Sequence, residues 1–253
     1  FGVANNLSNQ KKAKERKLAT YVTTDLTILK ECSIIFLALP IRHLIKPNRE
    51  LIENIPQKAI ITDVGSIKEP IINTWENLHP LFIGSHPMAG NEYKGVNAGK
   101  VNLFENSKWI ITPTPRTDME SVESLSELII SMQCEIIYSN PKDHDKATSL
   151  ISHLPIFFGS SLIQAAYEGN NQDVKILTQK IASSGFADSS RVGGGNAELG
   201  RDLAEFNNEN ILYGIRKLKV NLDDFERMII EKNWEKLYDK LDKSKDIRKK
   251  FFN

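Results

Sequence analysis

The chain is 253 residues long and its charges nearly cancel, with 33 Lys and Arg against 32 Asp and Glu and a formal net charge of +1. This balance argues against nucleic acid or a membrane surface as a partner, because both attract strongly basic proteins. The length allows one large domain or two modest ones, each with a buried core.

Two cysteines, Cys32 and Cys134, are too few for a disulfide framework and lack metal-ligand spacing, so we expect no metal site. The longest apolar run, 34–41, is much shorter than the roughly 20 residues of a membrane span. The first residues do not resemble a secretory signal. We therefore expect a cytoplasmic protein.

The first half of the chain alternates short apolar runs with helical stretches. Strands are predicted at 1–3, 21–23, 34–39, 59–62, 81–84, 109–112 and 136–138, and helices at 10–18, 43–53, 67–78 and 119–132. Continuous apolar strands separated by helices are typical of a parallel sheet covered on both faces. The pattern predicts a doubly wound α/β domain over residues 1–140.

The second half shows no strand pattern, and we predict an all-helical domain over residues 141–253. Helices are predicted at 143–168, 172–184, 198–222 and 223–252, the last one broken. The helix 148–167 is apolar on nearly all faces, so most of its faces must be buried. This favours a homodimer that covers the helix over burial within a single chain.

A dinucleotide-binding sheet normally opens with a strand and a G-x-G-x-x-G turn that approaches the pyrophosphate. The sequence has no such motif, and Gly2 stands alone near its start. If 1–3 is the second strand of such a sheet, roughly 25–30 residues with the first strand, turn and helix are missing. We expect an incomplete N-terminus; the alternative is a domain that binds no dinucleotide.

The segment after the first predicted strand is placed to contact the adenosine ribose. It contains Asn5, Ser8 and Asn9, two lysines follow, and no acidic residue occurs before Glu15. NAD enzymes tend to have a carboxylate here for the 2′-hydroxyl, and a carboxylate would repel the 2′-phosphate of NADP. The segment favours NADP over NAD; the alternative is a simple loop and helix cap.

Three further segments follow predicted strands, at the edge where open α/β sheets bind ligands. Leu39-Pro40-Ile41 can form an apolar wall for the cofactor, Gly65 and Ser66 lie at a strand-to-helix turn, and His86 lies between two glycines. A neutral imidazole can accept a proton during the oxidation of an alcohol, so His86 is a candidate base. Taken alone, Ser66 also fits a helix cap, and His86 also fits a structural turn histidine.

In the helical half, Arg191 precedes the triple glycine 193–195, and His153 lies in the segment Ser152-His153-Leu154-Pro155. An arginine flanked by glycines can hold a carboxylate with its planar fork of donors. A surface salt bridge is an equally good interpretation of Arg191.

Five segments together resemble the prephenate/arogenate dehydrogenase family, and they occur in the family's order over nearly the whole chain. They are DVGSIK (63–68), GSHPMAG (84–90), DHD (143–145), SHLP (152–155) and SSGFADSSRVGGGN (183–196). The histidine motif and the motif of arginine with three glycines are the specific ones. The likeness extends to the short cyanobacterial arogenate dehydrogenases in particular.

This resemblance implies a Rossmann-type domain followed by a helical dimerisation domain, and a cyclohexadienol substrate with a ring carboxylate. By motif match, His86 is the catalytic base facing the ring hydroxyl, Ser66 its hydrogen-bonding neighbour, and Arg191 the clamp on the carboxylate. The other expected contacts are His153 and Gly90 to the substrate and Gly65 to the cofactor. Hydride leaves the carbinol carbon as CO₂ departs, and holding both groups aligns these departures.

Many family members that use prephenate have a second histidine where this chain has Ile156, and arginine is frequent where Ala187 stands. We therefore predict NADP-dependent conversion of L-arogenate to L-tyrosine, with prephenate to 4-hydroxyphenylpyruvate as the alternative. A related β-hydroxyacid or imine reductase would need a lysine on the long helix, and 148–167 contains none. The remaining rival is a non-catalytic scaffold that lost its nucleotide turn.

Overall fold

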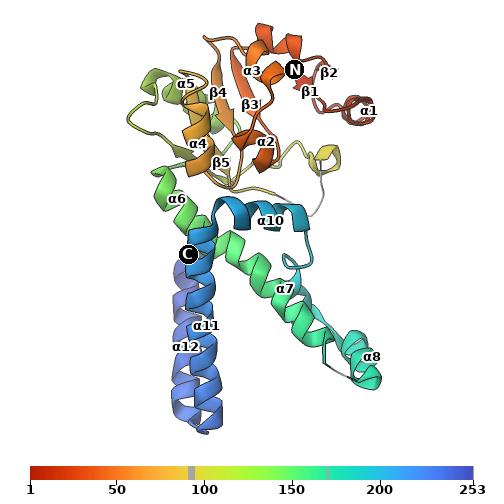
Figure 1. Ribbon diagram of the computed structural model, residues 1–253, viewed down its shortest axis with the longest axis vertical. Helices are drawn as coiled ribbons and strands as arrows, with labels where there is room; N and C mark the ends of the chain where they lie inside the picture. The colour runs from red at the N-terminus through yellow and green to blue at the C-terminus, as the bar shows by residue number, and fades with distance from the viewer. Residues whose placement is uncertain (91–94, 170, 253) are drawn as a thin grey trace. The chain divides into compact units, whose positions relative to one another are not determined.

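The computed structural model describes residues 1–90, 95–169 and 171–252 (Figure 1). The chain divides into two compact units, Phe1–Asn208 and Glu209–Asn253. The first unit contains the sheets and most of the helices, and the second is a pair of helices.

Among the described residues, the strands form two sheets. A small parallel sheet pairs β1 (Gly2–Val3) with β2 (Val22–Thr23). A five-stranded sheet has the order β3 (Ile34–Leu37), β4 (Ile60–Asp63), β5 (Phe82–Pro87), β6 (Lys108–Thr112) and β7 (Glu135–Tyr138). Every predicted strand overlaps an observed one, and the doubly wound α/β fold is confirmed.

One pair of strands departs from the predicted parallel arrangement, because β6 runs antiparallel to β5, with Gly84 opposite Thr112. Parallel neighbours need a crossover connection, which is usually an α-helix. The described part of the connection between β5 and β6 contains only a short 3₁₀ turn, η2 (Gly95–Ala98), so the chain reverses direction instead of crossing over.

The helices of this half are α1 (Leu7–Glu15), the 3₁₀ helix η1 (Leu26–Glu31), α2 (Ile41–Ile45), α3 (Arg49–Asn54), α4 (Glu69–Trp75) and α5 (Met119–Ser131). The side chains of Asn6, Asn48 and Asp118 accept backbone N–H groups at the starts of α1, α3 and α5. The helix predicted over 43–53 is two helices, since Pro47 between them has no N–H to donate and restricts the residue before it.

The core of the sheet packs against α5. Ile83, Trp109 and Ile111 of the strands meet Val122, Leu125 and Ile129, all at most 1% exposed. The spacing of three and four residues between the α5 positions puts them on one helix face.

The helical half begins at α6 (Pro141–Thr148), where the Asn140 side chain accepts the N–H of Asp143 and Pro141 occupies the first turn. Its other helices are α7 (Leu154–Tyr167), α8 (Gln172–Ile181), α9 (Ser184–Ser190), α10 (Ala197–Phe206), α11 (Asn208–Ile230) and α12 (Trp234–Phe252). The sequence prediction contained no helix at α9, whose first turn includes Gly185, a residue that disfavours helices. The predicted helix 198–222 is interrupted at Asn207 and continues to Ile230.

A π-helical turn, η3 (Ser149–His153), joins α6 to α7 and makes one continuous helical stretch (Figure 1). The N–H of Leu154 donates to the carbonyl of Ser149, five residues earlier. Pro155, which follows directly, cannot donate a backbone hydrogen bond, so the regular α-helical pattern is broken at this point.

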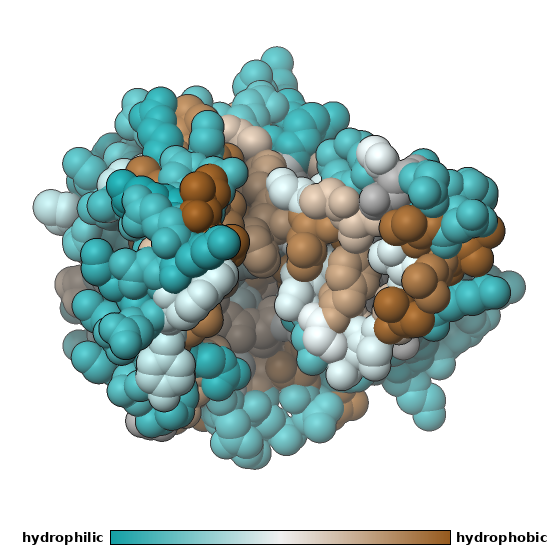
Figure 2. All heavy atoms as spheres, turned by 90° about the horizontal axis from the view of Figure 1, so that it is seen from below, coloured by the Kyte–Doolittle hydropathy of each residue, from teal (hydrophilic) through white to brown (hydrophobic). Residues whose placement is uncertain are grey.

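The apolar helix α7 is largely exposed to solvent, whereas an apolar helix in a monomeric protein would be buried. Gly159 is its one fully buried residue, whereas Ile151 in the preceding turn is 56% exposed and Phe158 40%. Patches of hydrophobic surface lie among hydrophilic residues on the face shown in Figure 2. By length and composition alone, the stretch Pro141–Tyr167 could also cross a membrane.

The triple glycine packs backbone to backbone against α7. A Cβ atom built on Gly193 would lie 2.1 Å from the backbone nitrogen of Ser160 and 2.2 Å from the carbonyl carbon of Gly159. A Cβ on Gly194 would meet only the end of the Ile163 side chain, at 3.7 Å. Gly193 is therefore required by a close approach of two backbones.

The second compact unit consists of α12 packed against α11. Lys240 of α12 donates to Asp224 of α11 at 3.0 Å, and its ammonium lies 4.8 Å from the centre of the Phe225 ring. One side chain thus combines an ion pair with a cation–π contact between the two helices.

Candidate active site

An ion pair with no exposure to solvent lies at the end of β4. The ammonium of Lys68 donates to the carboxylate of Asp63, and both side chains are 0% exposed. Asp63 also accepts the backbone N–H groups of Gly65 (2.8 Å) and Ser85 (3.2 Å), and Lys68 donates to the Ser85 carbonyl (2.5 Å). Burial raises the pKa of Asp63 and lowers that of Lys68, while their mutual attraction opposes both shifts.

This ion pair fixes the residue that precedes His86. Besides its backbone contacts, Ser85 donates its hydroxyl to the Asp63 carbonyl (2.7 Å) and accepts from Thr62 (2.8 Å) and the Trp109 indole (3.0 Å). Strand β5 is therefore held on both sides at the position where the imidazole emerges.

The start of α4 is capped by a residue of the helical half. Asp145 of α6 accepts the backbone N–H of Lys68 at 2.6 Å and that of Glu69 at 2.8 Å. The first N–H groups of a helix have no partner within the helix, so a carboxylate from elsewhere satisfies them well. Ser66 does not cap this helix, although its position in the sequence allowed that interpretation.

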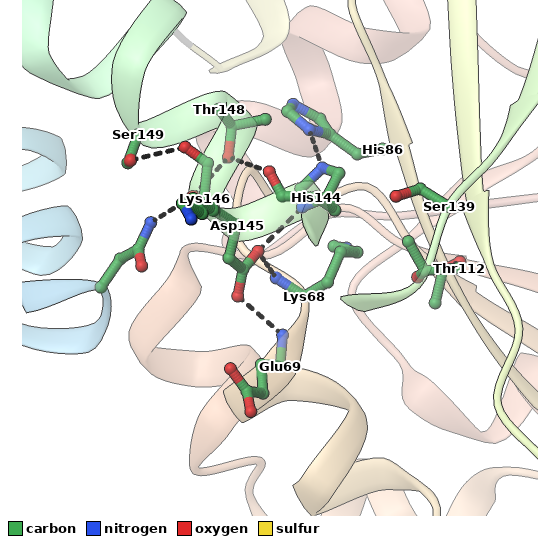
Figure 3. Close-up of polar contacts among 12 residues, drawn as sticks. Lys68, Glu69, His86, Thr112, Ser139, His144, Asp145, Lys146, Thr148 and Ser149 are labelled. Carbon is green, nitrogen blue, oxygen red and sulfur yellow. Dashed lines mark hydrogen bonds and ion pairs between the residues drawn. The ribbon is translucent and has the colours of Figure 1, made fainter. Parts of the chain in front are cut away.

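Two histidines and this carboxylate form a hydrogen-bonded chain (Figure 3). Nδ1 of His86 lies 2.9 Å from Nε2 of His144, and Nδ1 of His144 lies 2.8 Å from Oδ1 of Asp145. The imidazole rings are T-shaped, with centroids 5.1 Å apart. His86 is 8% exposed and the other two residues 2%, so little water competes for these contacts.

The charges around His86 favour its neutral form. Burial lowers the pKa of His86 well below its ordinary value, and the ammonium of Lys68 and the two nearby histidines lower it further. A neutral imidazole is the form that can accept a proton, so this environment suits a general base.

The π-helical turn places His153 beside this chain. Nδ1 of His153 lies 3.3 Å from the amide nitrogen of Asn207, which also donates to the carbonyl of Asp145 at 3.0 Å. Burial lowers the pKa of His153 to about 4, and the Asp145 carboxylate and a hydrogen bond with the Ser66 backbone partly offset this shift. The loop after β4, the turn η3 and α6 thus meet at one place.

A separate cavity of about 570 Å³ lies between the end of β1 and strand β3. Its lining includes Val3, Asn5, Leu29, Phe36 and Leu39. Apolar walls with a few polar groups at strand ends suit a nucleotide ligand. Within the part of the chain that the structure describes, no cluster of His, Cys, Asp and Glu side chains could hold a metal ion.

Two family models match the chain and together cover most of it. Residues 1–138 match the nucleotide-binding domain of prephenate dehydrogenase, and residues 140–243 match its dimerization domain. The chain belongs to the prephenate dehydrogenase family.

Individual relatives in the prephenate dehydrogenase family agree. The prephenate dehydrogenase of Bacillus subtilis is 30% identical over 224 residues, which are 87% of this chain and 60% of that protein. The cyclohexadienyl dehydrogenase of Zymomonas mobilis is 26% identical over 195 residues, which are 76% of this chain and 66% of that protein. The chain thus spans less than two thirds of the length of these relatives.

Solved structures of the family are similar over nearly the whole chain. The arogenate dehydrogenase of Synechocystis is 37% identical with a TM-score of 0.79, covering 99% of this chain and 90% of that one. A prephenate dehydrogenase of Aquifex aeolicus, solved with hydroxyphenyl propionate and NAD+, is 26% identical with a TM-score of 0.90, covering 99% and 88%.

The residues predicted to act in catalysis or to bind the substrate have different surroundings in this family member. Within the described residues, the hydrogen bond expected from Ser66 to His86 is absent, and His144 occupies the Nδ1 side instead. His153 is 0% exposed. Gly90 is exposed, and a Cβ on it would meet nothing within 4 Å. The side chain of Arg191 is exposed and has no ion-pair partner among the described residues.

The predicted cofactor contacts also divide into two groups. Asn5 and Leu39 line the cavity, and Pro40 is exposed next to it. Ile41 is 5% exposed because it packs into the core, and Gly65 is buried with its N–H on Asp63. Near β1, Asn6 forms the cap of α1 and Asn9 donates to the Asn5 side chain at 2.7 Å, while Ser8 is exposed in the first turn.

The sequence prediction assigned no role to His144 and Asp145. They were noted only as part of a motif in the helical half, because nothing in the spacing connects them with residues 58 or more positions earlier. The signal that was available is the DHD segment itself, which is one of the five segments that carry the family resemblance.

Proposed function

We propose that this protein oxidises and decarboxylates L-arogenate to L-tyrosine with NADP as the hydride acceptor. His86 is the general base that takes the proton of the ring hydroxyl. Arg191 binds the ring carboxylate that leaves as CO₂. Ser66 is the second catalytic residue, and His153 and Gly90 contact the substrate.

The observation that carries this proposal is the chemical state of His86. Its ring is nearly buried, its Nδ1 is already paired, and its surroundings favour the neutral form. A base needs a lone pair directed at the proton it removes, and the second ring nitrogen points away from His144 (Figure 3). Accepting the hydroxyl proton there assists the carbinol carbon to release its hydride, and the electron pair of the breaking C–CO₂ bond completes the aromatic ring.

Arogenate is favoured over prephenate by the residue that follows the SHLP segment. Ile156 replaces a histidine that many prephenate-using members have, and it lies 3.6 Å from the Cβ position of Gly200 in α10. The likeness to the Synechocystis arogenate dehydrogenase points the same way. Prephenate is the second candidate, because the Bacillus relative is named for it.

The cavity between β1 and β3 suits the adenosine end of a dinucleotide. The residues proposed to bind the dinucleotide as a whole are Asn5, Ser8, Asn9, Leu39, Pro40, Ile41 and Gly65. Bound there, the nicotinamide nucleotide would supply the acceptor for the hydride. The first two turns of α1 carry amides, a hydroxyl and lysines with no carboxylate, which favours the 2′-phosphate of NADP over NAD.

The proposed organisation is a dinucleotide-binding domain over residues 1–140 and a helical domain over 141–253 that dimerises. The exposed apolar side chains of η3, α7 and α8 support this, since soluble monomers rarely expose so many together. A homodimer also accounts for the apolar stretch Pro141–Tyr167 without a membrane, in keeping with a cytoplasmic enzyme.

The test is an assay of the full-length protein with arogenate or prephenate, each with NADP or NAD. We expect the highest kcat/KM with arogenate and NADP. His86→Asn should lower kcat by at least about 100-fold, the usual contribution of a general base. Arg191→Gln should mainly raise KM, by about 10-fold or more, as expected for a lost charged hydrogen bond.

Two residues outside both proposed sites supply matched controls, His79→Asn for the base and the exposed Arg49→Gln on α3 for the clamp. Neither should change kcat or KM. Unchanged turnover in His86→Asn would rule out the proposed base, and a preference for prephenate would replace the substrate while leaving the base in place.

A further inference from the structure

We propose that His144 is the positioning residue for the base: it holds His86 in the tautomer that carries its proton on Nδ1 and so leaves the Nε2 lone pair free for the substrate. This inference rests on the proposed function, because it concerns how His86 becomes a base. A residue of α6, in the helical half of the chain, would then set the position of the proton on His86, a residue of β5.

The argument begins at Asp145, whose hydrogen-bonding role is fixed by the backbone. The N–H groups of Lys68 and Glu69 can only donate, and they lie 2.6 and 2.8 Å from its two oxygens. Asp145 is 2% exposed, and its carboxylate oxygens therefore act as acceptors in a site with little water.

The next step fixes the proton of His144. Its Nδ1 lies 2.8 Å from Oδ1 of Asp145, and a contact between this nitrogen and an accepting oxygen requires a proton on the nitrogen. A neutral imidazole carries one proton, so Nε2 of His144 then has a lone pair. Nε2 of His144 can therefore only accept a hydrogen bond, and it faces His86 on β5.

The last step shows which nitrogen of His86 carries the proton. Its Nδ1 lies 2.9 Å from Nε2 of His144, and one of the two nitrogens must donate. Since the nitrogen of His144 accepts, the proton lies on Nδ1 of His86, and its Nε2 carries the lone pair. In the opposite tautomer two lone pairs would face each other and Nε2 could not accept the hydroxyl proton.

The same chain stabilises the product of the proton transfer. When the O–H bond breaks and the proton binds Nε2, His86 becomes a cation whose Nδ1–H still donates to His144, with the carboxylate of Asp145 behind it. No group has to move in this step, so the ring is ready in orientation before the substrate binds.

The test measures the tautomer directly, by ¹⁵N NMR of the full-length protein with labelled histidine. We expect His86 to show a protonated Nδ1 and an unprotonated Nε2 near neutral pH. His144→Phe keeps a ring of similar size but removes the acceptor, so His86 should lose its single tautomer and kcat should fall by about 100-fold with little change in KM. His144→Gln, whose amide oxygen can accept from Nδ1, should recover part of the lost kcat.

The matched control is His79→Phe, a buried histidine outside the site that is 4% exposed and contacts the Pro56 carbonyl at 2.9 Å. It should leave kcat and the His86 tautomer unchanged, even if the melting temperature falls. The proposal is overturned if wild-type His86 carries its proton on Nε2, a result that needs no variant to fold. It is also overturned if His144→Phe keeps the wild-type kcat.

The two proposals fail in distinguishable ways. Full activity in His86→Asn would refute the base and leave the measured tautomer as a structural fact. Loss of activity in His86→Asn together with full activity in His144→Phe would keep the base and refute its positioning by His144.

Discussion

At the scale of single residues, the site depends on histidines that are kept neutral by burial. His153 is the clearest case, since burial lowers its pKa from 6.5 to about 4. In the unfolded chain the same imidazole takes up a proton near pH 6.5, so between these values the unfolded state binds more protons than the folded state. Stability that is present above pH 6.5 is therefore lost as the pH falls toward 4.

This shift predicts a measurable acid sensitivity. The free energy of unfolding from urea titrations should fall between pH 7 and pH 4.5, with up to about 3 kcal/mol from His153 at 1.36 kcal/mol per pKa unit. His153→Gln should make this pH dependence shallower but not abolish it, because His86 is shifted in the same direction.

Ser124→Ala on α5 is the control, because Ser124 is exposed and has no ionisable group, so this substitution should leave the slope as it is. An equal slope in wild type and His153→Gln would mean that the folded protein protonates His153 as easily as the unfolded chain does.

The sequence predicted His86 as the candidate base but did not predict its partners. That prediction rests on the glycines and the proline around His86, which are local features. Its contacts with His144 and the ion pair of Asp63 with Lys68 depend on how β4, β5 and α6 come together. No local pattern in the sequence carries that information.

At the scale of elements, the triple glycine shows how a short segment fixes two helices. Gly193→Ala would place a Cβ inside the backbone of α7 at Ser160, so α7 or the turn after α9 would have to move. We expect a loss of about 3 kcal/mol in the free energy of unfolding, at the upper end for overpacking. A lower melting temperature measured by circular dichroism would report it.

Gly194→Ala is the matched control in the same run of glycines. Its Cβ would meet only the end of Ile163, at ordinary contact distance, so the melting temperature should change little. Equal effects of the two substitutions would show that flexibility of the loop, and not the close approach to α7, explains the glycines.

Element prediction succeeded where apolar periodicity was strong and failed where side chains from elsewhere decide the boundary. Strands β3 to β7 and helix α5 follow from their patterns. Helix α9 was missed because glycine was given its usual weight as a breaker, and the reversal of β6 depends on the path of a connection that has no periodic pattern. The start of α4 depends on Asp145, which is far away in the sequence.

At the scale of the whole molecule, the exposed apolar faces predict a dimer. Phe158→Glu on α7 would put a charge into the proposed interface, where burying an unpaired charge is costly. The protein should then elute as a monomer in size-exclusion chromatography with light scattering, whereas the wild type should have twice the mass of one chain.

Met119→Glu on α5 is the control, since Met119 is 56% exposed but lies on the nucleotide-binding half. The Met119→Glu variant should remain dimeric. A wild-type protein that is monomeric at micromolar concentration would contradict the proposed homodimer.

The π-helical turn has a consequence for the changes in chain length that this helical stretch tolerates. His144 and His153 are nine positions apart, and a regular helix at 3.6 residues per turn would direct them about 180° apart. The wide turn carries roughly one extra residue, which corresponds to about 100° of rotation, and so brings the two rings toward the same side. Deleting a single residue from Ser149–Ser152 would therefore close the wide turn into regular α-helix and leave the direction of α7 unchanged, whereas inserting a residue there would rotate all of α7 and turn its apolar face away from a partner.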